Sequence, residues 1–335
     1  MTLRRPILVT GATGFVGGAL VRALLEDGVP PADLRLLVRD RTRACAGGLP
    51  APCLVEGDLG DPAALAAAAR GVQLAFHLAG ATTACSRAEF FRANATGTGN
   101  LVAALATHAA GCRLVHVSSL AAAGPSTGAS AAPPPGAGRP CSNYGRSKLA
   151  GEREVAGAGG AMLSWIIVRP PVIYGPGDPA TRLLFRSALG VIAPVPWTAR
   201  ALSVMHVDDV VRALRQAALA PDAELALALD GPDRLTSHEL LRAVAQACGR
   251  RARLVRLPLW LIWPAAAVAD GFARLRGRGS FFGRDKLREL RHGWVADPGP
   301  AHERLGFVAS VTSRLGLAAT ARAAGLAPRR ERAPS

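Results

Sequence analysis

The side chains best suited to proton transfer are Tyr144 and Lys148, which lie four residues apart in the segment Y-G-R-S-K. Residues at this spacing share one face of a helix, so the phenol and the ammonium can point into one cleft. The positive charge favours the phenolate and lowers the tyrosine pKa from its usual value of about 10. The pair therefore predicts acid–base chemistry at Tyr144, with an exposed helical pair as the alternative.

A glycine-rich turn, T-G-A-T-G-F-V-G, follows the first apolar run at residues 7–9 and precedes a predicted helix over residues 15–27. Glycines permit a tight turn, a close approach of backbone N–H groups to a pyrophosphate, and close packing of helix and strand. The helix N-terminus adds free N–H donors and a positive dipole end. A merely tight turn is the alternative, and the strand–turn–helix context favours the phosphate site. The predicted cofactor contacts in this turn are Gly11, Thr13, Gly14, Phe15, Val16 and Gly17.

Arg39 ends the second apolar run, residues 34–38. An acidic residue at this point would hold the ribose 2′-hydroxyl of NAD, whereas an arginine suits the 2′-phosphate of NADP. Arg41 and Arg43 follow, so this stretch predicts NADP and leaves NAD open. The alternative is a solvated basic loop, which Asp40 supports.

Two further strand ends offer cofactor contacts. Asp58 and Leu59 follow the apolar residues 54–55, and the Asp58 carboxylate could receive an adenine amino group. The strand predicted over residues 74–78 closes on small residues, which would let a cofactor lie against the backbone. The predicted contacts there are Leu78, Ala79 and Gly80.

These groups need a scaffold that brings strand ends together. Predicted strands and helices alternate regularly along the chain, which implies a doubly wound parallel sheet with right-handed crossovers. Helices are predicted over residues 62–70 and 88–109, and a strand over residues 114–117 leads to Ser119 at the carboxyl edge of the sheet. Ligands bind at that edge in such folds, which supports Ser119 and Tyr144 as active-site candidates.

Composition excludes several classes. The 335 residues are 50% hydrophobic, enough for a sizeable core, and carry a net charge of +16. The arginines are scattered and aromatic residues are few, so attraction to anionic cofactors or membrane surfaces is expected rather than nucleic-acid binding. Six cysteines without a C-x-x-C pair predict reduced thiols and no metal site. Without a signal peptide or a spanning run, a cytoplasmic protein is expected.

The motifs as a set resemble the extended short-chain dehydrogenase/reductase family, also called the NAD-dependent epimerase/dehydratase family. The resemblance covers about two-thirds of the chain and implies a Rossmann fold with a smaller, mostly helical C-terminal substrate lobe. It is carried by T-G-A-T-G-F-V-G (residues 10–17), G-D-L (57–59), H-L-A-G (77–80), N-A-T-G-T (94–98), V-S-S (117–119), Y-G-R-S-K (144–148), R-P-P-V-I-Y-G-P-G (169–177) and H-V-D-D-V (206–210).

The resemblance also implies roles. Tyr144 would be the general acid/base, Lys148 would hold the nicotinamide ribose and tune Tyr144, and Ser119 would hydrogen-bond the reacting oxygen. Asn94 would support the active site. Pro170 and Val172, after the strand at residues 162–168, would contact the nicotinamide edge. His206, Asp208 and Asp209 are expected to begin a helix with Asp as the cap, and His77 is expected to be a packed strand-end residue.

Departures from the family pattern indicate the substrate. Val172 and Leu202 stand where nucleotide-sugar enzymes of the family usually place Asn and Arg, so the chain looks closer to the dihydroflavonol reductase and 3β-hydroxysteroid dehydrogenase branches. This predicts an NAD(P)-dependent oxidoreductase acting on a secondary alcohol or ketone of a mainly apolar small molecule. An NAD-dependent nucleotide-sugar epimerase is the alternative, because Arg182, Arg186 and Arg200 could hold a diphosphate. A non-catalytic dinucleotide-binding protein is a third hypothesis.

The C-terminal part carries an apolar run over residues 257–269 between arginines, and an amphipathic helix is predicted over residues 281–294. The run could wall a substrate pocket, lie in a membrane interface or form an ordinary buried helix. Four aromatic residues are expected to line an apolar pocket: Trp260, Trp263, Phe281 and Phe282. Weak peripheral contact with membranes and a homodimer are both compatible with the sequence.

The predicted domain organisation has two parts and a tail. The dinucleotide-binding domain spans residues 1–170, with residues 203–235 returning to it. The substrate lobe comprises residues 171–202 and 236–327, and residues 328–335 are expected to form a disordered tail.

Overall fold

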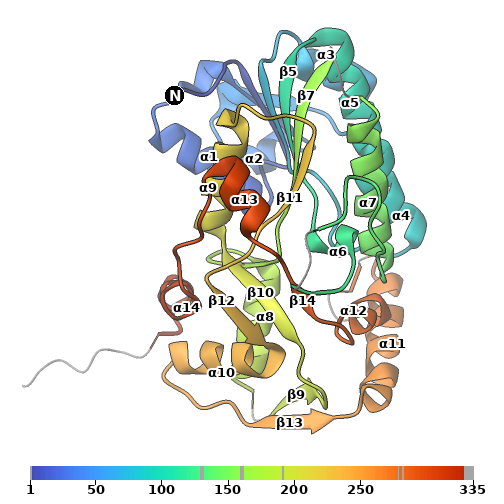
Figure 1. Ribbon diagram of the computed structural model, residues 1–335, viewed down its shortest axis with the longest axis vertical. Helices are drawn as coiled ribbons and strands as arrows, with labels where there is room; N and C mark the ends of the chain where they lie inside the picture. Colours follow the sequence, from blue (N-terminus) through green and yellow to red (C-terminus); the bar gives the residue numbers. More distant parts are fainter. Residues whose placement is uncertain are drawn as a thin grey trace, which may run out of the picture.

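The computed structural model describes most of the chain. The described residues are 2–128, 132–158, 162–190, 192–277, 279–280 and 283–327. Figure 1 shows a parallel sheet between two groups of helices in its upper half and a set of small sheets and helices in its lower half.

A seven-stranded parallel sheet forms the centre of the upper half, in the order β11-β7-β5-β4-β1-β2-β3. Its strands are apolar along nearly their whole length because both faces are covered. The strands are β1 (Ile7–Thr10), β2 (Leu34–Val38), β3 (Leu54–Glu56), β4 (Leu74–His77), β5 (Cys112–Val117), β7 (Leu163–Arg169) and β11 (Leu225–Ala228).

Helices pack on both faces of this sheet, which confirms the predicted doubly wound architecture (Figure 1). Successive residues of a strand point to opposite faces. Ile7 and Val9 accordingly join the core beneath α1 (Phe15–Glu26) and α9 (Val207–Leu219). Leu8 joins the opposite core, formed with α3 (Pro62–Ala69), α5 (Gly97–His108) and α7 (Asn143–Ala156).

The strand order reverses between β1 and β4. From β1 the chain continues to β2 on one side, and from β4 it continues to β5 on the other. In open α/β sheets the crevice at such a switch point, beyond the carboxyl ends of the strands, is where ligands bind. The residues that follow Thr10 and His77 therefore lie where a cofactor is expected.

The lower half contains two smaller sheets. One has the order β12-β10-β14-β6, with β8 paired to β10, and the other is the ribbon β13-β9. These strands are β6 (Ser126–Thr127), β8 (Val172–Tyr174), β9 (Ala193–Pro196), β10 (Ala201–His206), β12 (Asp233–Thr236), β13 (Leu254–Leu257) and β14 (Trp294–Val295). The helices of this half are α8 (Pro179–Ala188), α10 (Ser237–Ala247), α11 (Leu259–Leu275) and α12 (Arg284–Glu289). The predicted domain boundaries stay a prediction.

The remaining helices are short or lie at the C-terminus. Two of them follow the strands that carry the site, α4 (Arg87–Phe91) and α6 (Leu120–Ala123). The others are α2 (Arg41–Ala46), α13 (Gly299–Leu305) and α14 (Ser313–Ala323).

The helix predicted over residues 88–109 is confirmed, with a π turn at Arg92–Thr96 in its middle. Helix α7 packs so closely against this turn that a Cβ on Gly151 would lie 2.2 Å from the Asn94 carbonyl oxygen. The helix predicted over residues 281–294 is wrong in extent, because within the described residues it is confined to α12. Trp294 instead pairs with Leu202 in the small sheet, since that sheet needs an apolar strand at this position.

Candidate active site

The glycine turn after β1 is shaped as a cradle that side chains would fill. Gly11 has a φ of +77°, and a Cβ on it would lie 2.6 Å from the Ala79 nitrogen. A Cβ on Gly17 would lie 2.1 Å from the Gly11 oxygen. Helix α1 begins at Gly14 without a side-chain cap and has no acidic residue in its first turn. The donors of this helix end are thus left for an anion, which fits a dinucleotide pyrophosphate.

The other predicted residues of this turn lie at the same edge of the sheet. Thr13 and Gly14 are exposed, and Phe15 and Val16 are half-buried. Across the switch point, the Ala79 N–H donates to the Thr10 hydroxyl at 3.3 Å, which fixes the end of β4 against the end of β1. Leu78 and Ala79 are half-buried, while Gly80 is exposed.

Arg39 is exposed at the end of β2 and has no hydrogen-bond or ion-pair partner among the described residues. Its neighbours are occupied. The Asp40 carboxylate caps α2 by accepting the Arg43 N–H at 2.8 Å, and the Arg41 guanidinium donates to the Leu54 carbonyl at 3.0 Å. The acidic residue that supported a solvated loop is therefore part of a helix cap, and Arg39 is left as an available cation.

Asp58 and Leu59 follow β3 at the same edge. Asp58 is exposed, and one of its carboxylate oxygens accepts the Gly60 N–H at 2.7 Å, which leaves the other oxygen available. The half-buried Leu59 accepts a hydrogen bond from the Asn100 side chain at 2.8 Å through its carbonyl.

Ser119 and Tyr144 meet beyond the end of β5. Ser119 caps α6, where its hydroxyl accepts the Ala121 N–H at 3.1 Å, and it is close enough to the Tyr144 phenol to affect the pKa of that group. Burial raises the Tyr144 pKa to about 12, the Ser119 side chain opposes that shift, and the Glu289 carboxylate adds to it. The predicted lowering of this pKa is wrong for the cofactor-free protein, because loss of hydration of the phenolate outweighs the favourable contacts.

Lys148 lies one helical turn after Tyr144 and is buried. Its ammonium donates to the Val117 carbonyl at 2.7 Å and sits 3.7 Å from the point that a Cβ on Gly80 would occupy. Burial lowers the Lys148 pKa to about 8, and the Glu152 carboxylate opposes that shift. The cation is therefore held between the ends of β4 and β5, at the predicted cofactor crevice.

Asn94 joins the cofactor crevice to the helix of Tyr144. Its side chain is fully buried in the π turn, accepts the Ala81 N–H at 2.7 Å, and donates to the Ala81 carbonyl at 3.0 Å and the Ser147 hydroxyl at 2.8 Å. Ser147 lies between Tyr144 and Lys148 on α7. The geometry gives Asn94 a positioning role, in line with the predicted support of the site.

The N-terminus of α7 is held by two acidic residues from α12, which the sequence did not reveal. The Asp285 carboxylate accepts the N–H groups of Asn143, at 2.9 and 3.0 Å, and of Tyr144, at 3.2 Å. Glu289 accepts from the Ser142 hydroxyl at 2.7 Å. Negative charge at a helix N-terminus is favourable. No local pattern could have indicated these contacts, because they join segments more than 140 residues apart.

A buried ion pair joins the elements that carry the site. The Arg169 guanidinium and the Glu152 carboxylate lie 2.6 Å apart, and both side chains are fully buried. Glu152 also accepts from the Ser118 hydroxyl at 2.6 Å, and Arg169 donates to the carbonyls of Pro133 and Pro134. The pair ties β5, β7 and α7 to the loop after β6.

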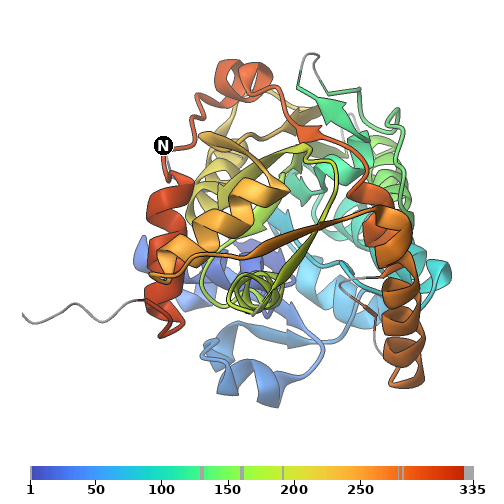
Figure 2. The same ribbon diagram turned by 90° about the horizontal axis from the view of Figure 1, so that it is seen from below.

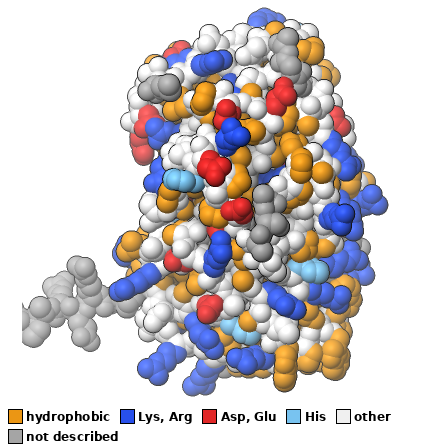
Figure 3. Space-filling view, in the orientation of Figure 1, with side chains coloured by type: hydrophobic (Ala, Val, Ile, Leu, Met, Phe, Trp, Pro, Cys, Tyr) orange, Lys and Arg blue, Asp and Glu red, His pale blue; other side chains and the backbone are white. Residues whose placement is uncertain are grey.

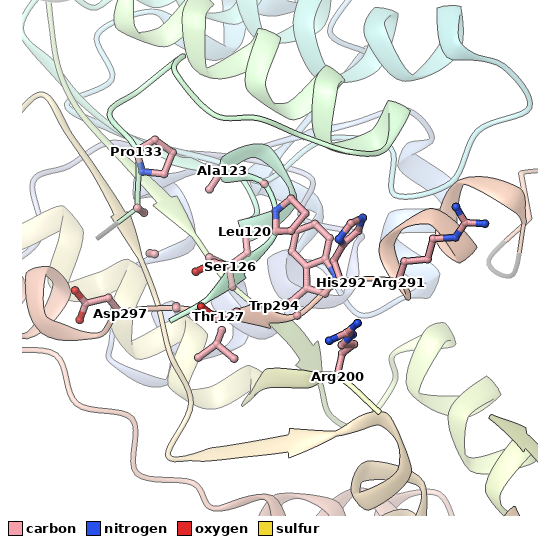
Figure 4. A pocket seen from close by; sticks show the side chains of 17 residues that line it. Leu120, Ala123, Ser126, Thr127, Pro133, Arg200, Arg291, His292, Trp294 and Asp297 are labelled. Carbon is pink, nitrogen blue, oxygen red and sulfur yellow. The ribbon is translucent and has the colours of Figure 1, made fainter. Parts of the chain in front are cut away.

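A cavity of about 480 Å³ is lined by Leu120, the residue that follows Ser119, whereas Ser119, Tyr144 and Lys148 are not among its lining residues. Figure 4 shows Arg200, His292 and Trp294 on one side of it and Pro133 and Asp297 on the other. Its lining mixes apolar and polar side chains, among them Leu120, Ala123, Ser126, Thr127, Pro133, Arg200, Arg291, His292, Trp294 and Asp297. Arg200 and Arg291 place two guanidinium cations at this cavity, of which the sequence indicated only Arg200 as a candidate.

Several predicted pocket residues lie elsewhere. Trp260 is 73% exposed on the surface, and Trp263 packs beneath the Arg291 guanidinium, 5.7 Å from its ring centre. Leu202 is buried in the core of the lower half, since its strand pairs with β12 and β14. Arg182 and Arg186 are exposed on α8 and do not line the cavity. Phe281 and Phe282 lie outside the described residues.

The segment after β7 passes beside Ser119. Pro170 is buried, and its carbonyl accepts the Leu120 N–H at 3.0 Å. Val172 is 39% exposed and belongs to β8, which pairs with β10. Contact of Pro170 and Val172 with a nicotinamide stays a prediction.

His206, Asp208 and Asp209 begin α9 as predicted, but the cap differs. The His206 ring accepts the Asp208 N–H at 3.4 Å, whereas Asp209 accepts the N–H groups of Ser310 and Val311. Asp209 is therefore committed to the C-terminal segment, because burial requires partners for its charge. His77 is fully buried between the hydroxyls of Thr10 and Thr98, which confirms a packed strand-end residue.

The part of the chain that the structure describes holds no group of three or more His, Cys, Asp or Glu residues suited to a metal ion. The described cysteines form no disulfide with one another. No helix among the described residues is both long enough and apolar enough to cross a bilayer.

Comparison with known proteins agrees with this geometry. The model of the NAD-dependent epimerase/dehydratase family matches residues 7–226. A ceramide reductase from Caulobacter vibrioides is 38% identical over 318 residues, covering 94% of this chain and 91% of the relative. A 2-alkyl-3-oxoalkanoate reductase from Stenotrophomonas maltophilia is 31% identical over 255 residues, covering 72% of this chain and 76% of the relative.

Solved structures share the fold along nearly the whole chain. The structure of MoeE5 in complex with UDP-glucuronic acid and NAD superposes with a TM-score of 0.73 at 26% identity. The match covers 95% of this chain and 98% of that protein.

Proposed function

This chain belongs to the NAD-dependent epimerase/dehydratase family, and from this membership we propose that it reduces a ketone on an aliphatic, amphiphilic molecule with NADPH. The observation that carries the proposal is the juxtaposition of Ser119, Tyr144 and the buried Lys148 at the carboxyl end of β5, next to Leu120 of the cavity wall. A serine and a tyrosine placed in this way can both reach one carbonyl oxygen. A non-catalytic dinucleotide-binding protein would have no need of this arrangement.

The residues around the crevice fit the cofactor. The glycine turn would hold the pyrophosphate, and Asp58 and Leu59 would lie by the adenine. The small residues after β4, Leu78 to Gly80, would let the cofactor lie against their backbone. Lys148 would hold the nicotinamide ribose by its ammonium. Bound NADPH would supply a hydride to the carbonyl carbon of the substrate.

The protein's own groups would handle the proton. Ser119 would donate a hydrogen bond to the carbonyl oxygen and orient it, and Tyr144 would transfer its phenolic proton to that oxygen, so that an alcohol forms. A pKa raised to about 12 keeps Tyr144 protonated at neutral pH. This state suits the reductive direction, in which the tyrosine is the proton donor.

The substrate class follows from the relatives and from the cavity. The two relatives described above are named as reductases of a ceramide and of a 2-alkyl-3-oxoalkanoate, which are aliphatic rather than sugar molecules. Leu120, Pro133 and Trp294 offer apolar contacts, and Arg200 and Arg291 would bind a polar or anionic end. This lining suits an amphiphile.

We expect NADPH-dependent turnover of 2-alkyl-3-oxoalkanoates or of 3-oxo lipid amides, measured as loss of NADPH absorbance. The same compounds should raise the melting temperature when NADP is present, because a ligand that binds only the folded state stabilises it. UDP and UDP-glucose serve as the contrasting ligands. Stabilisation by UDP-glucose, with none from the oxo compounds, would replace this substrate class by the nucleotide-sugar one.

A nucleotide-sugar epimerase is the second candidate, and the cationic cavity is what favours it. Arg200, Arg291 and His292 could pair with a diphosphate, and the structurally similar MoeE5 is described with UDP-glucuronic acid and NAD. Such an enzyme would consume no net NADPH, because the hydride returns to the substrate. The turnover assay therefore separates the two candidates.

Cofactor choice gives a separate prediction. NADPH should bind about 10- to 100-fold more tightly than NADH, since one charge-assisted pair contributes about 1.5–3 kcal/mol. Arg39→Asp should narrow or reverse this preference in calorimetric titrations. Arg22→Asp, which makes the same charge change on an exposed position of α1, should leave it intact. Equal affinity of the unmutated protein for both cofactors would contradict the assignment.

A further inference from the structure

Helix α11 exposes an apolar stripe to solvent. Trp260, Val268, Phe272 and Leu275 are 73%, 71%, 55% and 87% exposed. With the exposed Pro264, their spacing of three or four residues places them along one face of the helix. A 17-residue helix is about 25 Å long, so the stripe runs over a considerable length. A helix of a soluble protein ordinarily turns such a face inward.

The opposite face of α11 is the one that packs onto the protein. Ala266 is buried, Trp263 lies beneath Arg291, and the Asp270 carboxylate caps α12 by accepting the Arg284 N–H at 2.9 Å. Figures 1 and 2 both place α11 at the right-hand margin of the molecule, outside α12. The orientation of the helix is thus set by its inner contacts, and the apolar stripe is left outside.

A second group of exposed apolar side chains adjoins the start of this helix. The Trp197 N–H donates to the Leu257 carbonyl at 2.8 Å, two residues before α11 begins, and the Trp197 side chain is 65% exposed. Leu261 is 48% exposed. Together with Trp260 they place two exposed tryptophans at one end of the stripe. Tryptophan is the residue that favours the interface between lipid and water.

Arginines flank the α11 segment in the sequence, and acidic residues are scarce there. Arg250, Arg251, Arg253, Arg256 and Arg276 are all exposed, and residues 248–280 contain one acidic residue, Asp270, which pairs with Arg284. Figure 3 shows hydrophobic side chains at the lower right, where α11 lies, with Lys and Arg side chains around them. Apolar side chains ringed by cations match a lipid surface that carries negative charge.

We propose that α11 and the adjoining Trp197 dock the protein reversibly on anionic bilayers, with the apolar stripe in the interface and the arginines on lipid phosphates. A second copy of the chain fits less well. In a two-fold symmetric contact the same patch faces itself, which would bring arginines against arginines with no carboxylate between them. The proposal does not depend on the reaction, and it would give an amphiphilic substrate a short path to the cavity.

Co-sedimentation tests the proposal with the full chain. Vesicles of phosphatidylcholine with phosphatidylglycerol should retain the protein at least about tenfold better than pure phosphatidylcholine, and salt of about 0.5 M should abolish the difference. Val268→Glu/Phe272→Glu should lower retention at least about tenfold, because carboxylates are costly in the interface and repelled by anionic lipid. Val308→Glu/Leu315→Glu is the matched control, since these side chains are 62% and 64% exposed outside the α11 surface.

Unchanged circular dichroism and NADPH binding show whether each variant is folded. Failure of the wild-type protein to bind anionic vesicles would overturn the proposal. So would an equal loss of binding in the control variant. A dimer in sedimentation velocity that Val268→Glu/Phe272→Glu dissociates, without vesicle binding, would assign the face to a second copy instead.

Discussion

Tyr144→Phe is expected to lower kcat by about 10²- to 10⁴-fold, because the substitution removes the one proton that the phenol transfers. The aromatic ring stays, so its tilted contact with Phe90, at 6.1 Å between ring centres, should persist. The dissociation constant of NADPH should change less than about threefold, since the cofactor is held by other groups. Steady-state kinetics with an oxo substrate and a fluorescence titration with NADPH measure both quantities.

Tyr174→Phe is the matched control, because Tyr174 is the second of the two tyrosines in the chain. Its hydroxyl is buried in the lower half and has no hydrogen-bond partner among the described residues. Removing that hydroxyl should leave kcat within about threefold of the unmutated value and should not lower stability. If Tyr144→Phe retained more than about a tenth of the activity, another group would have to supply the proton.

Glu152→Gln is expected to lower the free energy of unfolding by about 3–5 kcal/mol, because it leaves the Arg169 charge buried without its counter-ion. Both side chains are fully buried, and water cannot solvate the remaining guanidinium. The loop after β6 should loosen as well, since Arg169 holds the carbonyls of Pro133 and Pro134 and Pro133 lines the cavity. Urea unfolding followed by circular dichroism gives the change in stability.

Asp27→Asn provides the comparison for this prediction. Asp27 pairs with Arg215 at the surface, where both side chains are more than a third exposed. An exposed pair contributes about 0–1 kcal/mol, so the two substitutions should differ by at least about 2 kcal/mol. Equal unfolding midpoints for the two variants would show that the Glu152–Arg169 pair adds nothing beyond a surface contact.

The local features of the site could be predicted because their physics is local. The glycine turn after β1 consists of consecutive residues, and Gly11 adopts a positive φ of +77° that other residues rarely adopt. The spacing of Tyr144 and Lys148 fixes their shared helix, and Arg39 follows directly on β2. Alternation of apolar runs with helical patterns was enough to predict the doubly wound sheet.

The tertiary structure decided what depends on distant partners. Asp285 and Glu289 hold the helix of Tyr144 from more than 140 residues away, and no periodicity in either segment indicates that contact. The rise of the Tyr144 pKa also follows from burial, which reverses the sign expected from the nearby lysine.

In the C-terminal lobe, too, the sequence predicts the helix and distant contacts decide which of its faces is exposed. The apolar composition of residues 257–269 is compatible both with a buried helix and with an exposed one, so it does not predict which of the two forms. Contacts of Trp263 and Asp270 with the α12 region turn the Trp260 and Val268 face outward. Likewise, Arg200 and Arg291 belong to one cavity only because the small sheet brings β10 and β14 together. The sequence by itself determined most of the elements and the candidate reacting groups. Packing between elements determined exposure, pKa and pocket lining, because each of these depends on neighbours that are distant along the chain.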